Sequence, residues 1–600
     1  MFLIGLNYWS KGGGPLMWRF FNEEVVDKEL AQIRELGVDV IRAFVYWPDF
    51  QREPGKIDEE MLRRLGRFLD LAHKHDVGVF LTFVVGHMSG ENWDPQWKGG
   101  RDFFELRNEV KTLMETVVSR FRGHPAIRGW ILSNELPIYA TSSEERVTDW
   151  IREMSSLIKS LDGAHWVSTG DGCWGIMGAF NGFNPYRYRD YVDYMGPHFY
   201  TPDTDAFRHT VMPQLIIKAC RGLGKPTILE EFGASSTLGS DEHIAGYYRV
   251  LLAGSLVSGA VGAWGWCYSD FPLTNQRPYS HHPHELRFGV TTVNWEVKPQ
   301  GNELTRFSRL VSTLGDVEPV EDPVALLIPS YVYWSYPFTS KDDARRISAA
   351  LLASYSMLVQ NGLNPRVIIE EPLTDNVLIE RGKTRIGGDV KVLFLPCALR
   401  YLAQTQEEVR RFVENGGVAV VSYCYGFWMN IDWAIKLDLY YNYPITADGL
   451  STVVDGVSIN VPAMGYNYDR AIARVSGGEV LLKDSMGNPV IAYSNVGAGR
   501  VYFITYPIEY WLGMNPKPFE NHDAHLIYSL ILRREGFNVQ TPSKWVQVAR
   551  LKSARYNYTV YINHSWSDIK INVNGINVES GERINGEYVI KGKDYLVLRT

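Results

Sequence analysis

Two apolar runs in this chain end in carboxylates. Gly129–Glu135 reads Gly-Trp-Ile-Leu-Ser-Asn-Glu and is closed by a proline, and Lys225–Gly233 reads Lys-Pro-Thr-Ile-Leu-Glu-Glu-Phe-Gly. Each run is typical of a strand with a charged group at its carboxyl end, where parallel α/β folds keep their chemistry. Two carboxyl groups that meet there could flank one glycosidic bond, so the pattern favours a glycosidase.

The second run offers two carboxylates, Glu230 and Glu231. Adjacent residues of a strand point to opposite faces, so we expect only one of them to reach a pocket. The alternation by itself leaves open which of the two it is. In the first run, Glu135 is the carboxylate and Asn134 precedes it.

The elements that must position these residues divide the chain into three regions. Residues 1–315 alternate short β-rich runs with segments of helical periodicity, which predicts a (β/α)8 barrel. A doubly wound open sheet is the alternative, but no G-x-G-x-x-G follows the first strand. Residues 316–445 predict a smaller flavodoxin-like α/β domain, and residues 446–600 a mainly β region that includes a small β-sandwich.

The first region resembles the clan A retaining glycoside hydrolases over its whole length, and family 5 most closely. That clan contains cellulases, β-mannanases, β-mannosidases and β-galactosidases. The similar motifs, in chain order, are Gly37–Arg42, Ser133-Asn134-Glu135, His198-Phe199-Tyr200, Glu231-Phe232-Gly233, Trp264 with Trp266, and Phe288-Gly289-Val290 followed by Lys298-Pro299.

The resemblance implies a role for each matched residue. Glu231, placed directly before the aromatic-Gly pair, is the implied nucleophile, and Glu135 the acid/base. Arg42 and Tyr200 are expected to favour the ionised form of Glu231. Asn134 is suited to hydrogen-bond the sugar 2-hydroxyl.

Further residues are expected to bind substrate. His198 matches the sixth-strand motif, and we prefer Trp264 to Trp266 as the platform under the sugar. Two predicted loops supply candidates for the pocket rim, listed here: His87, Trp93 and Glu285. The segment His281–Glu285 has the composition of a metal cluster, but proline breaks the helical spacing of its ligands. We therefore expect no metal and no organic cofactor.

The second region resembles the non-catalytic middle domain of family 42 β-galactosidases, which serves trimerisation there. The likeness implies a homo-oligomer, a dimer or trimer, whose neighbouring subunits could wall the active site. Cys397 follows a predicted strand, but the G-x-C-x-G turn of a nucleophilic cysteine is missing, so we expect it to be inert.

Composition narrows the class of protein. The net charge of -7 over 600 residues argues against a nucleic-acid or anionic-membrane partner. No apolar run reaches the length of a membrane span, and the N-terminus reads as a strand, so we expect a cytoplasmic protein. The five cysteines are scattered without a C-x-x-C pair, which predicts reduced thiols and neither a disulfide nor a zinc site.

These observations predict a retaining, exo-acting β-glycosidase that removes β-linked sugars from the non-reducing end, with a β-mannoside as the first choice of substrate. A β-galactosidase or β-glucosidase is the alternative within this class, followed by an endo-β-mannanase. A catalytically inactive carbohydrate-binding or scaffold protein is the alternative from a different class.

Overall fold

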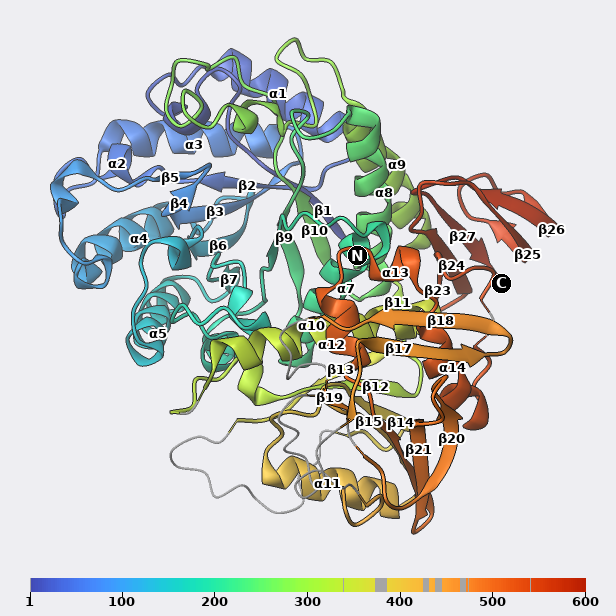
Figure 1. The fold of residues 1–600 in the computed structure, drawn as a ribbon. Helices are drawn as coiled ribbons and strands as arrows, with labels where there is room; N and C mark the ends of the chain where they lie inside the picture. Colours follow the sequence, from blue (N-terminus) through green and yellow to red (C-terminus); the bar gives the residue numbers. More distant parts are fainter. Residues whose placement is uncertain are drawn as a thin grey trace. The chain divides into compact units, whose positions relative to one another are not determined.

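The structure is a computed structural model that describes residues 2–337, 339–372, 386–424, 431–436, 445–464, 471–472, 474–539 and 541–600. The chain forms two compact units (Figure 1). The first contains Met1–Thr201, Leu223–Val317 and Val578–Gly581, and the second contains Pro202–Gly222, Glu318–Asn577 and Glu582–Thr600.

Eight parallel strands form the centre of the first unit, in the order β7-β6-β3-β2-β1-β10-β9-β8. Between β7 and β8 the parallel bridge Gly172–Pro197 joins the two ends of this order. The predicted barrel is confirmed. The strands are β1 Leu3–Asn7, β2 Val40–Phe44, β3 Gly78–Val84, β6 Ile127–Ser133, β7 Trp166–Ser168, β8 His198–Phe199, β9 Ile228–Phe232 and β10 Gly262–Gly265.

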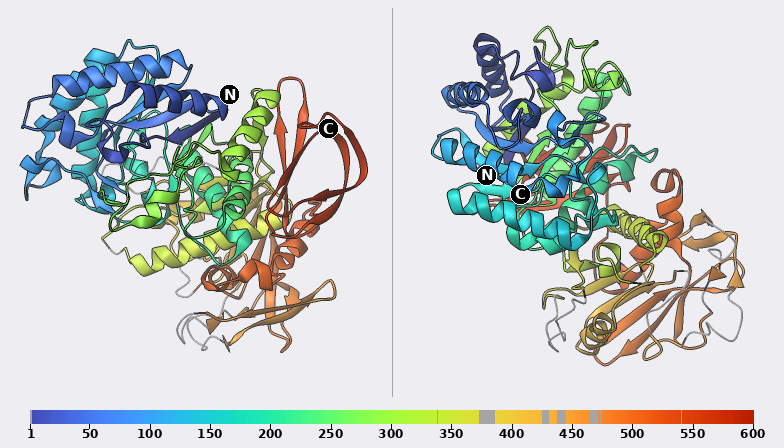
Figure 2. Two further views of the ribbon diagram at one scale, coloured as in Figure 1. Left: turned by 90° about the horizontal axis from the view of Figure 1, so that it is seen from above. Right: turned by 90° about the vertical axis from the view of Figure 1, so that its left-hand side faces the viewer.

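Helices of the first unit lie outside the strands (Figures 1 and 2). Asp58 caps the longest early helix by accepting from the backbone N–H groups of Glu60 and Met61, which would otherwise lack partners. Its apolar stripe, Met61, Leu62, Leu65, Phe68 and Leu69, is buried. The helices are α1 Glu23–Glu35, α3 Glu59–Lys74, α4 Arg107–Phe121, α5 Glu144–Leu161, α8 Asp241–Val257 and α9 Pro299–Leu314.

Trp264 fills the interior of the barrel. A Cβ on Gly5, its neighbour on β1, would lie only 2.1 Å from the indole ring, so glycine is required there. The indole belongs to a buried cluster that also contains Val40, Phe80, Ile131, Tyr194 and Ile228. This packing anchors the strands whose carboxyl ends carry the polar residues described below.

The second unit contains a seven-stranded sheet in the order β13-β12-β14-β15-β22-β21-β20. Its first five strands are parallel and, numbered along the chain, follow the order 2-1-3-4-5 of flavodoxin-like folds, which confirms that prediction. The strands are β12 Val324–Ile328, β13 Arg366–Ile369, β14 Val392–Leu395, β15 Val418–Ser422, β20 Glu479–Lys483, β21 Pro489–Val496 and β22 Gly499–Ile504. Strands β20 to β22 lie beyond residue 445, so the sheet crosses the predicted boundary.

The end of the chain forms a six-stranded antiparallel sheet, β11-β23-β24-β27-β25-β26 (Figure 2). Its apolar core contains Val546, Ile571, Val573, Ile590, Leu596 and Leu598. The strands are β11 Glu318–Val320, β23 Val546–Lys552, β24 Asn557–Asn563, β25 Ile569–Asn577, β26 Arg583–Ile590 and β27 Tyr595–Arg599. Within the described ranges, no helix is long and apolar enough to cross a membrane.

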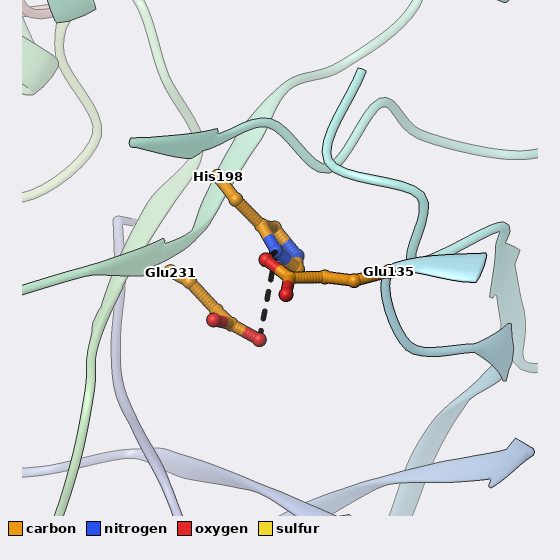
Figure 3. A group of neighbouring side chains, drawn as sticks. All are labelled: Glu135, His198 and Glu231. Carbon is orange, nitrogen blue, oxygen red and sulfur yellow. Dashed lines mark hydrogen bonds and ion pairs between the residues drawn. The ribbon is translucent and has the colours of Figure 1, made fainter. Parts of the chain in front are cut away.

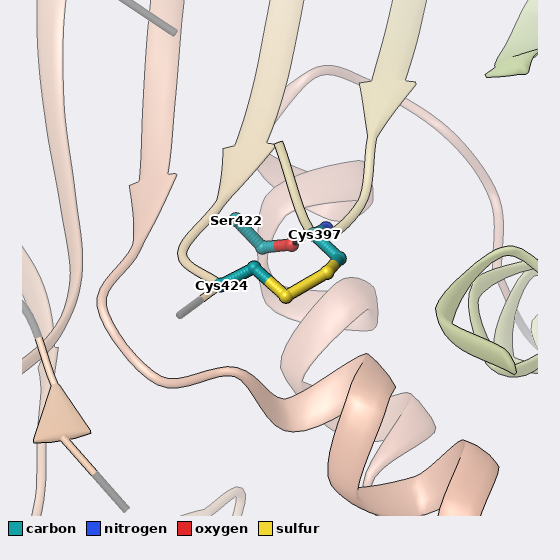
Figure 4. The surroundings of a disulfide bond; sticks show 3 residues. All are labelled: Cys397, Ser422 and Cys424. Carbon is teal, nitrogen blue, oxygen red and sulfur yellow. Dashed lines mark hydrogen bonds between the residues drawn. A yellow bond between two sulfur atoms is a disulfide. The ribbon is translucent and has the colours of Figure 1, made fainter. Parts of the chain in front are cut away.

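The prediction that all cysteines are reduced is wrong for one pair. Cys397 and Cys424 form a disulfide, with their Cα atoms 4.5 Å apart (Figure 4). Each follows the last residue of its strand by two positions, and β14 and β15 are paired neighbours. The sheet therefore brings together two residues that are 27 positions apart in sequence. Cys173, Cys220 and Cys267 are reduced and buried, as expected.

We expect Cys397→Ser and Cys424→Ser each to lower the free energy of unfolding of the second unit by about 3 kcal/mol, because the crosslink restricts the unfolded chain. Denaturant unfolding with and without reductant measures this. Reductant should destabilise the wild type and the Cys220→Ala control but leave the two serine variants unchanged. Equal sensitivity in all four proteins would contradict the crosslink.

Candidate functional site

The two predicted carboxylates meet at the carboxyl end of the barrel. Glu135 follows β6 and Glu231 lies in β9, and their side chains converge with that of His198 (Figure 3). One ligand atom from each of these three residues lies within 4.8 Å of the others. An approach this close fits the spacing of roughly 5–5.5 Å between the two carboxyl groups of retaining glycosidases.

The backbone at Glu135 is held in the left-handed region, with φ of 46°. That conformation is unusual for a residue other than glycine and needs support from its surroundings. The Glu135 N–H donates to the carbonyl of Gly170 at 2.8 Å. A Cβ on Gly170 would lie 1.9 Å from the Ser133 carbonyl oxygen, so glycine allows this close approach.

Arg42 links the strands that carry Glu135 and Glu231. Its guanidinium is fully buried and donates to Glu231 Oε1 at 2.5 Å and to Asn134 Oδ1 at 2.8 Å. Thr82 Oγ1 accepts from its Nε at 3.0 Å, and Asn7 Oδ1 from its Nη1 at 3.3 Å. A buried cation with this many partners fixes the positions of the side chains around it.

Both oxygens of Glu231 accept hydrogen bonds. Arg42 occupies one, and the Tyr200 hydroxyl donates to the other at 2.8 Å. Burial raises the pKa of Glu231, whereas the positive charges of His198 and Arg42 and the Tyr200 hydrogen bond act in the opposite direction. These partners stabilise a carboxylate that would otherwise be costly to bury.

His198 lies between three glutamates. Its Nδ1 is 2.9 Å from Glu135 Oε1 and 3.6 Å from Glu231 Oε1, and its Nε2 is 3.4 Å from Glu230 Oε2. Burial alone would lower the pKa of His198, but the Glu231 charge and the hydrogen bonds to Glu135 and Glu230 raise it to about 10. The imidazolium form is therefore favoured at neutral pH.

The side chains of Glu230 and Glu231 point to opposite faces of the strand, as the alternation of a strand requires. It is fully buried, and a Cβ on Gly196 would lie 2.2 Å from its carboxyl carbon. The structure thus places Glu230 behind His198 and directs Glu231 toward Glu135.

The preference for Trp264 over Trp266 is wrong. Trp264 lies in the barrel interior, whereas Trp266 follows the end of β10 and donates a hydrogen bond to Glu285. A register shift between Ala263 and Gly265 interrupts the strand, so the two tryptophans do not continue the same alternation. Burial, together with the charges of Glu231 and Glu135, raises the pKa of Glu285 to about 7 against its hydrogen bonds from Ser89 and Trp266.

The loop after β3 contributes a backbone contact. The carbonyl of His87 accepts from Asn134 Nδ2 at 2.6 Å, while the His87 ring contacts Asn92. Trp93 is buried within this loop, where its indole N–H donates to the Met88 carbonyl at 3.0 Å. His87 thus orients Asn134, and Trp93 packs the loop.

The sequence did not point to three residues of the site. Asn7 and Thr82 accept hydrogen bonds from Arg42, and Ser89 Oγ donates to Glu285 Oε2 at 2.9 Å. Asn7 ends the first predicted strand and Thr82 interrupts an otherwise apolar one. A polar residue at such a position is a signal that could have found the first two. Ser89 lies in a loop and gives no comparable signal.

Glu135, His198 and Glu231 could together offer three ligand atoms to a metal ion. The guanidinium of Arg42 already contacts Glu231, however, and the His198 pKa of about 10 favours a cationic ring that cannot bind a metal. The donor set therefore fits proton transfer and nucleophilic attack better than metal binding.

Residues 10–271 match the protein-family model of cellulase (glycosyl hydrolase family 5). The chain contains a family 5 glycoside hydrolase domain. In sequence it is similar to a probable mannan endo-1,4-beta-mannosidase F of Neosartorya fischeri, with 26% identity over 246 residues that cover 36% of this chain and 51% of the relative. The chain spans between 51% and 62% of the length of the first three such relatives.

Two solved structures extend the likeness beyond the family 5 domain. The exo-beta-1,4-mannosidase Op5Man5 from Opitutaceae bacterium strain TAV5 superposes with a TM-score of 0.74 at 20% identity, covering 88% of this chain and 96% of that one. A beta-galactosidase from Bacillus circulans sp. alkalophilus gives a TM-score of 0.72 at 14% identity, covering 100% and 98%. At these identities the likeness concerns the fold.

We expect His198→Gln to remove a contribution to stability that depends on pH. Because the folded pKa of His198 is raised from 6.5 to about 10, this contribution is complete below about pH 6.5 and is lost as the pH rises to about 10. Thermal unfolding across this range should show the gap between wild type and variant narrowing with pH. The gap for His73→Gln, an exposed helix residue, should stay constant. A gap that widened with pH would contradict the assignment.

Proposed function

We propose that this protein is a retaining β-glycosidase that cleaves β-mannosides from the non-reducing end. The observation that carries the proposal is the approach of Glu135 and Glu231 to within 4.8 Å, each in a different hydrogen-bonding environment. Two carboxyl groups so close, one with an arginine and one without, are suited to the two roles of a double displacement.

In the first step, Glu231 attacks the anomeric carbon while Glu135 protonates the leaving oxygen. Arg42 and Tyr200 keep Glu231 ionised and aligned until the ester bond forms. Asn134, held by Arg42 and by the His87 carbonyl, faces the sugar 2-hydroxyl with its remaining N–H. A hydrogen bond there strengthens as the transition state gains oxocarbenium character.

In the second step, Glu135 acts as the base that activates water. Esterification removes the negative charge of Glu231, so His198 loses one of the charges that raise its pKa. The charge of Glu231 therefore raises the pKa of His198 in the first step but not in the second. This coupling supports a single residue acting first as acid and then as base.

The choice of a β-mannoside rests on similarity. The curated relatives of the family 5 domain are named mannan endo-1,4-beta-mannosidases, and one structural relative is an exo-beta-1,4-mannosidase. A β-galactosidase stays the alternative because a beta-galactosidase shares the fold over the whole chain. A β-glucosidase and an endo-β-mannanase are further alternatives, and an inactive binding protein is disfavoured by the complete catalytic set.

The proposal also covers the oligomeric state of the protein and its cellular location. We infer a homo-oligomer, a dimer or trimer, from the flavodoxin-like domain, and light scattering on the purified protein tests it. Location in the cytoplasm stays a prediction. The Cys397–Cys424 disulfide weighs against it, because the cytosol is reducing and keeps most thiols from forming disulfides.

The proposal is tested by hydrolysis of aryl β-mannoside, β-galactoside, β-glucoside and β-xyloside substrates. We expect the β-mannoside to give the highest kcat/KM, with single sugars released. Glu231→Ala, assayed beside the wild type, excludes a contaminating activity. If another sugar is preferred, the assignment of a β-mannoside as substrate is wrong. If none of the four substrates is hydrolysed, the proposed exo-glycosidase action is wrong.

We expect Glu231→Ala to reduce turnover by at least roughly 10⁴-fold, because no nucleophile is left. In Glu135→Ala, substrates with good leaving groups should still form the ester, which then hydrolyses slowly. Added azide should give a β-glycosyl azide with Glu135→Ala and an α-glycosyl azide with Glu231→Ala, identified by NMR. Glu230→Ala is the matched control, and an α-azide from it would assign the nucleophile to Glu230 instead.

A further inference from the structure

The loop after β3 contains a short hairpin. It pairs β4, His87–Met88, with β5, Glu91–Asn92, through a turn at Ser89 and Gly90. Both turn residues have positive φ, 55° and 77°, as a two-residue type I′ turn requires. The turn gives the tip a fixed shape, with Ser89 and Glu91 as its polar side chains.

The tip of this hairpin binds the loop after β10. Glu91 forms ion pairs with Arg277 and, at 3.4 Å, with His281. Ser89 Oγ donates to Glu285 Oε2 at 2.9 Å. We call this set of contacts the loop bridge.

Close packing accompanies the polar contacts of the loop bridge. A Cβ on Gly90 would lie 2.5 Å from Nε2 of His282, so the backbone of the hairpin tip rests directly against that ring. The side chain of Glu91 is only 11% exposed, whereas that of Arg277 is 73% exposed. The bridge is therefore a packed contact whose outer edge is an ion pair.

The position of the loop bridge follows from the strand order. Strands β3 and β10 are separated in the barrel by β2 and β1, so contacts between their loops extend across the carboxyl ends of both. The loop after β1 joins them, since Trp9 Nε1 donates to Met88 Sδ at 2.9 Å and Gln276 Nε2 to the Gly13 carbonyl at 3.1 Å. One side of the barrel mouth is thus closed by three connected loops.

On the proposed function, the closed side faces the non-reducing end of the substrate. Glu135 protonates the leaving group, so the leaving group lies toward β6. On the proposed function the reacting sugar lies on the other side of the scissile bond, and the resemblance of the eighth-strand motif assigns it to Trp266, which follows the end of β10. Glu285 accepts from both Trp266 and Ser89, and therefore places the loop bridge immediately beyond that sugar.

We propose that the loop bridge limits the site to one sugar on the non-reducing side of the scissile bond, with Ser89 and Glu91 as the positioning residues that determine exo action. A chain that continues past the first sugar would have to pass through the contacts of Glu91 with Arg277 and His281. This inference rests on the proposed function, because it concerns the same site.

The test uses an aryl β-mannobioside, in which the aryl group follows two β-linked mannosyl units. An exo enzyme first releases mannose, so the aryl group appears after a lag. The double variant Ser89→Ala/Glu91→Gln removes both kinds of polar contact, since one exposed ion pair contributes little by itself. We expect its initial release of mannobiose to rise at least about tenfold over the wild type, and the lag to shorten.

Two controls separate this effect from a loss of structure. Glu60→Gln removes the same charge from ion pairs with Arg63 and Arg64 on α3, outside the loops, and should keep the lag. The exchanged pair Glu91→Arg/Arg277→Glu restores the ion pair with opposite polarity and should return the release of mannobiose toward the wild-type level. Activity on the aryl β-mannoside reports whether each variant retains the catalytic centre.

The outcomes distinguish the two proposals. A wild type that cleaves no aryl β-mannoside overturns the proposed substrate. A wild type that releases mannobiose at once, or a double variant that still cleaves the aryl β-mannoside yet keeps the wild-type lag, overturns the role of the loop bridge while leaving the glycosidase intact.

Discussion

The buried guanidinium of Arg42 is the interaction on which the site depends. It contacts Glu231 on β9, Asn134 at the end of β6, Thr82 on β3 and Asn7 on β1, and so connects strands from both sides of the barrel. An uncompensated charge at this depth would destabilise the fold by about 3–5 kcal/mol. The same contact that makes the buried carboxylate tolerable also holds Glu231, the proposed nucleophile, opposite Glu135.

Around this centre, charges are arranged so that the two glutamates differ. Glu231 is held by Arg42 and Tyr200, whereas Glu135 contacts His198, a residue that can itself gain or lose a proton. The difference arises from the strands that supply the partners. Arg42 on β2 reaches across the barrel to Glu231 on β9, and His198 on β8 reaches Glu135, which follows β6. Loops extend beyond these ends, and the loop bridge, to which we assign the limit on substrate length, is the place where three of them meet.

Much of the fold follows from patterns that the sequence shows directly. The alternation of apolar strands and amphipathic helices predicted the barrel and the flavodoxin-like domain, since each element must bury one face. Strand-end residues such as Glu135 and Glu231 could be identified because their neighbours along the chain fix where the strand stops, whereas Arg42, in the middle of β2, was identified only through the resemblance of its motif. The boundary at residue 445 was less predictable, because β22 joins the sheet only by pairing in parallel with the distant β15, and β21 and β20 then extend the sheet as antiparallel strands.

The sequence alone determined the barrel, its two strand-end glutamates and the family of its motifs, because these depend on local periodicity and on residue type. Only the tertiary structure decided what depends on neighbours across the sheet. A register shift in β10 turns Trp264 into the core and leaves Trp266 beside Glu285. The pairing of β14 with β15 brings Cys397 to Cys424. The loop bridge joins segments nearly two hundred residues apart, as in the contact of Ser89 with Glu285. Such contacts have no local signature, since they are set by the order in which strands lie side by side.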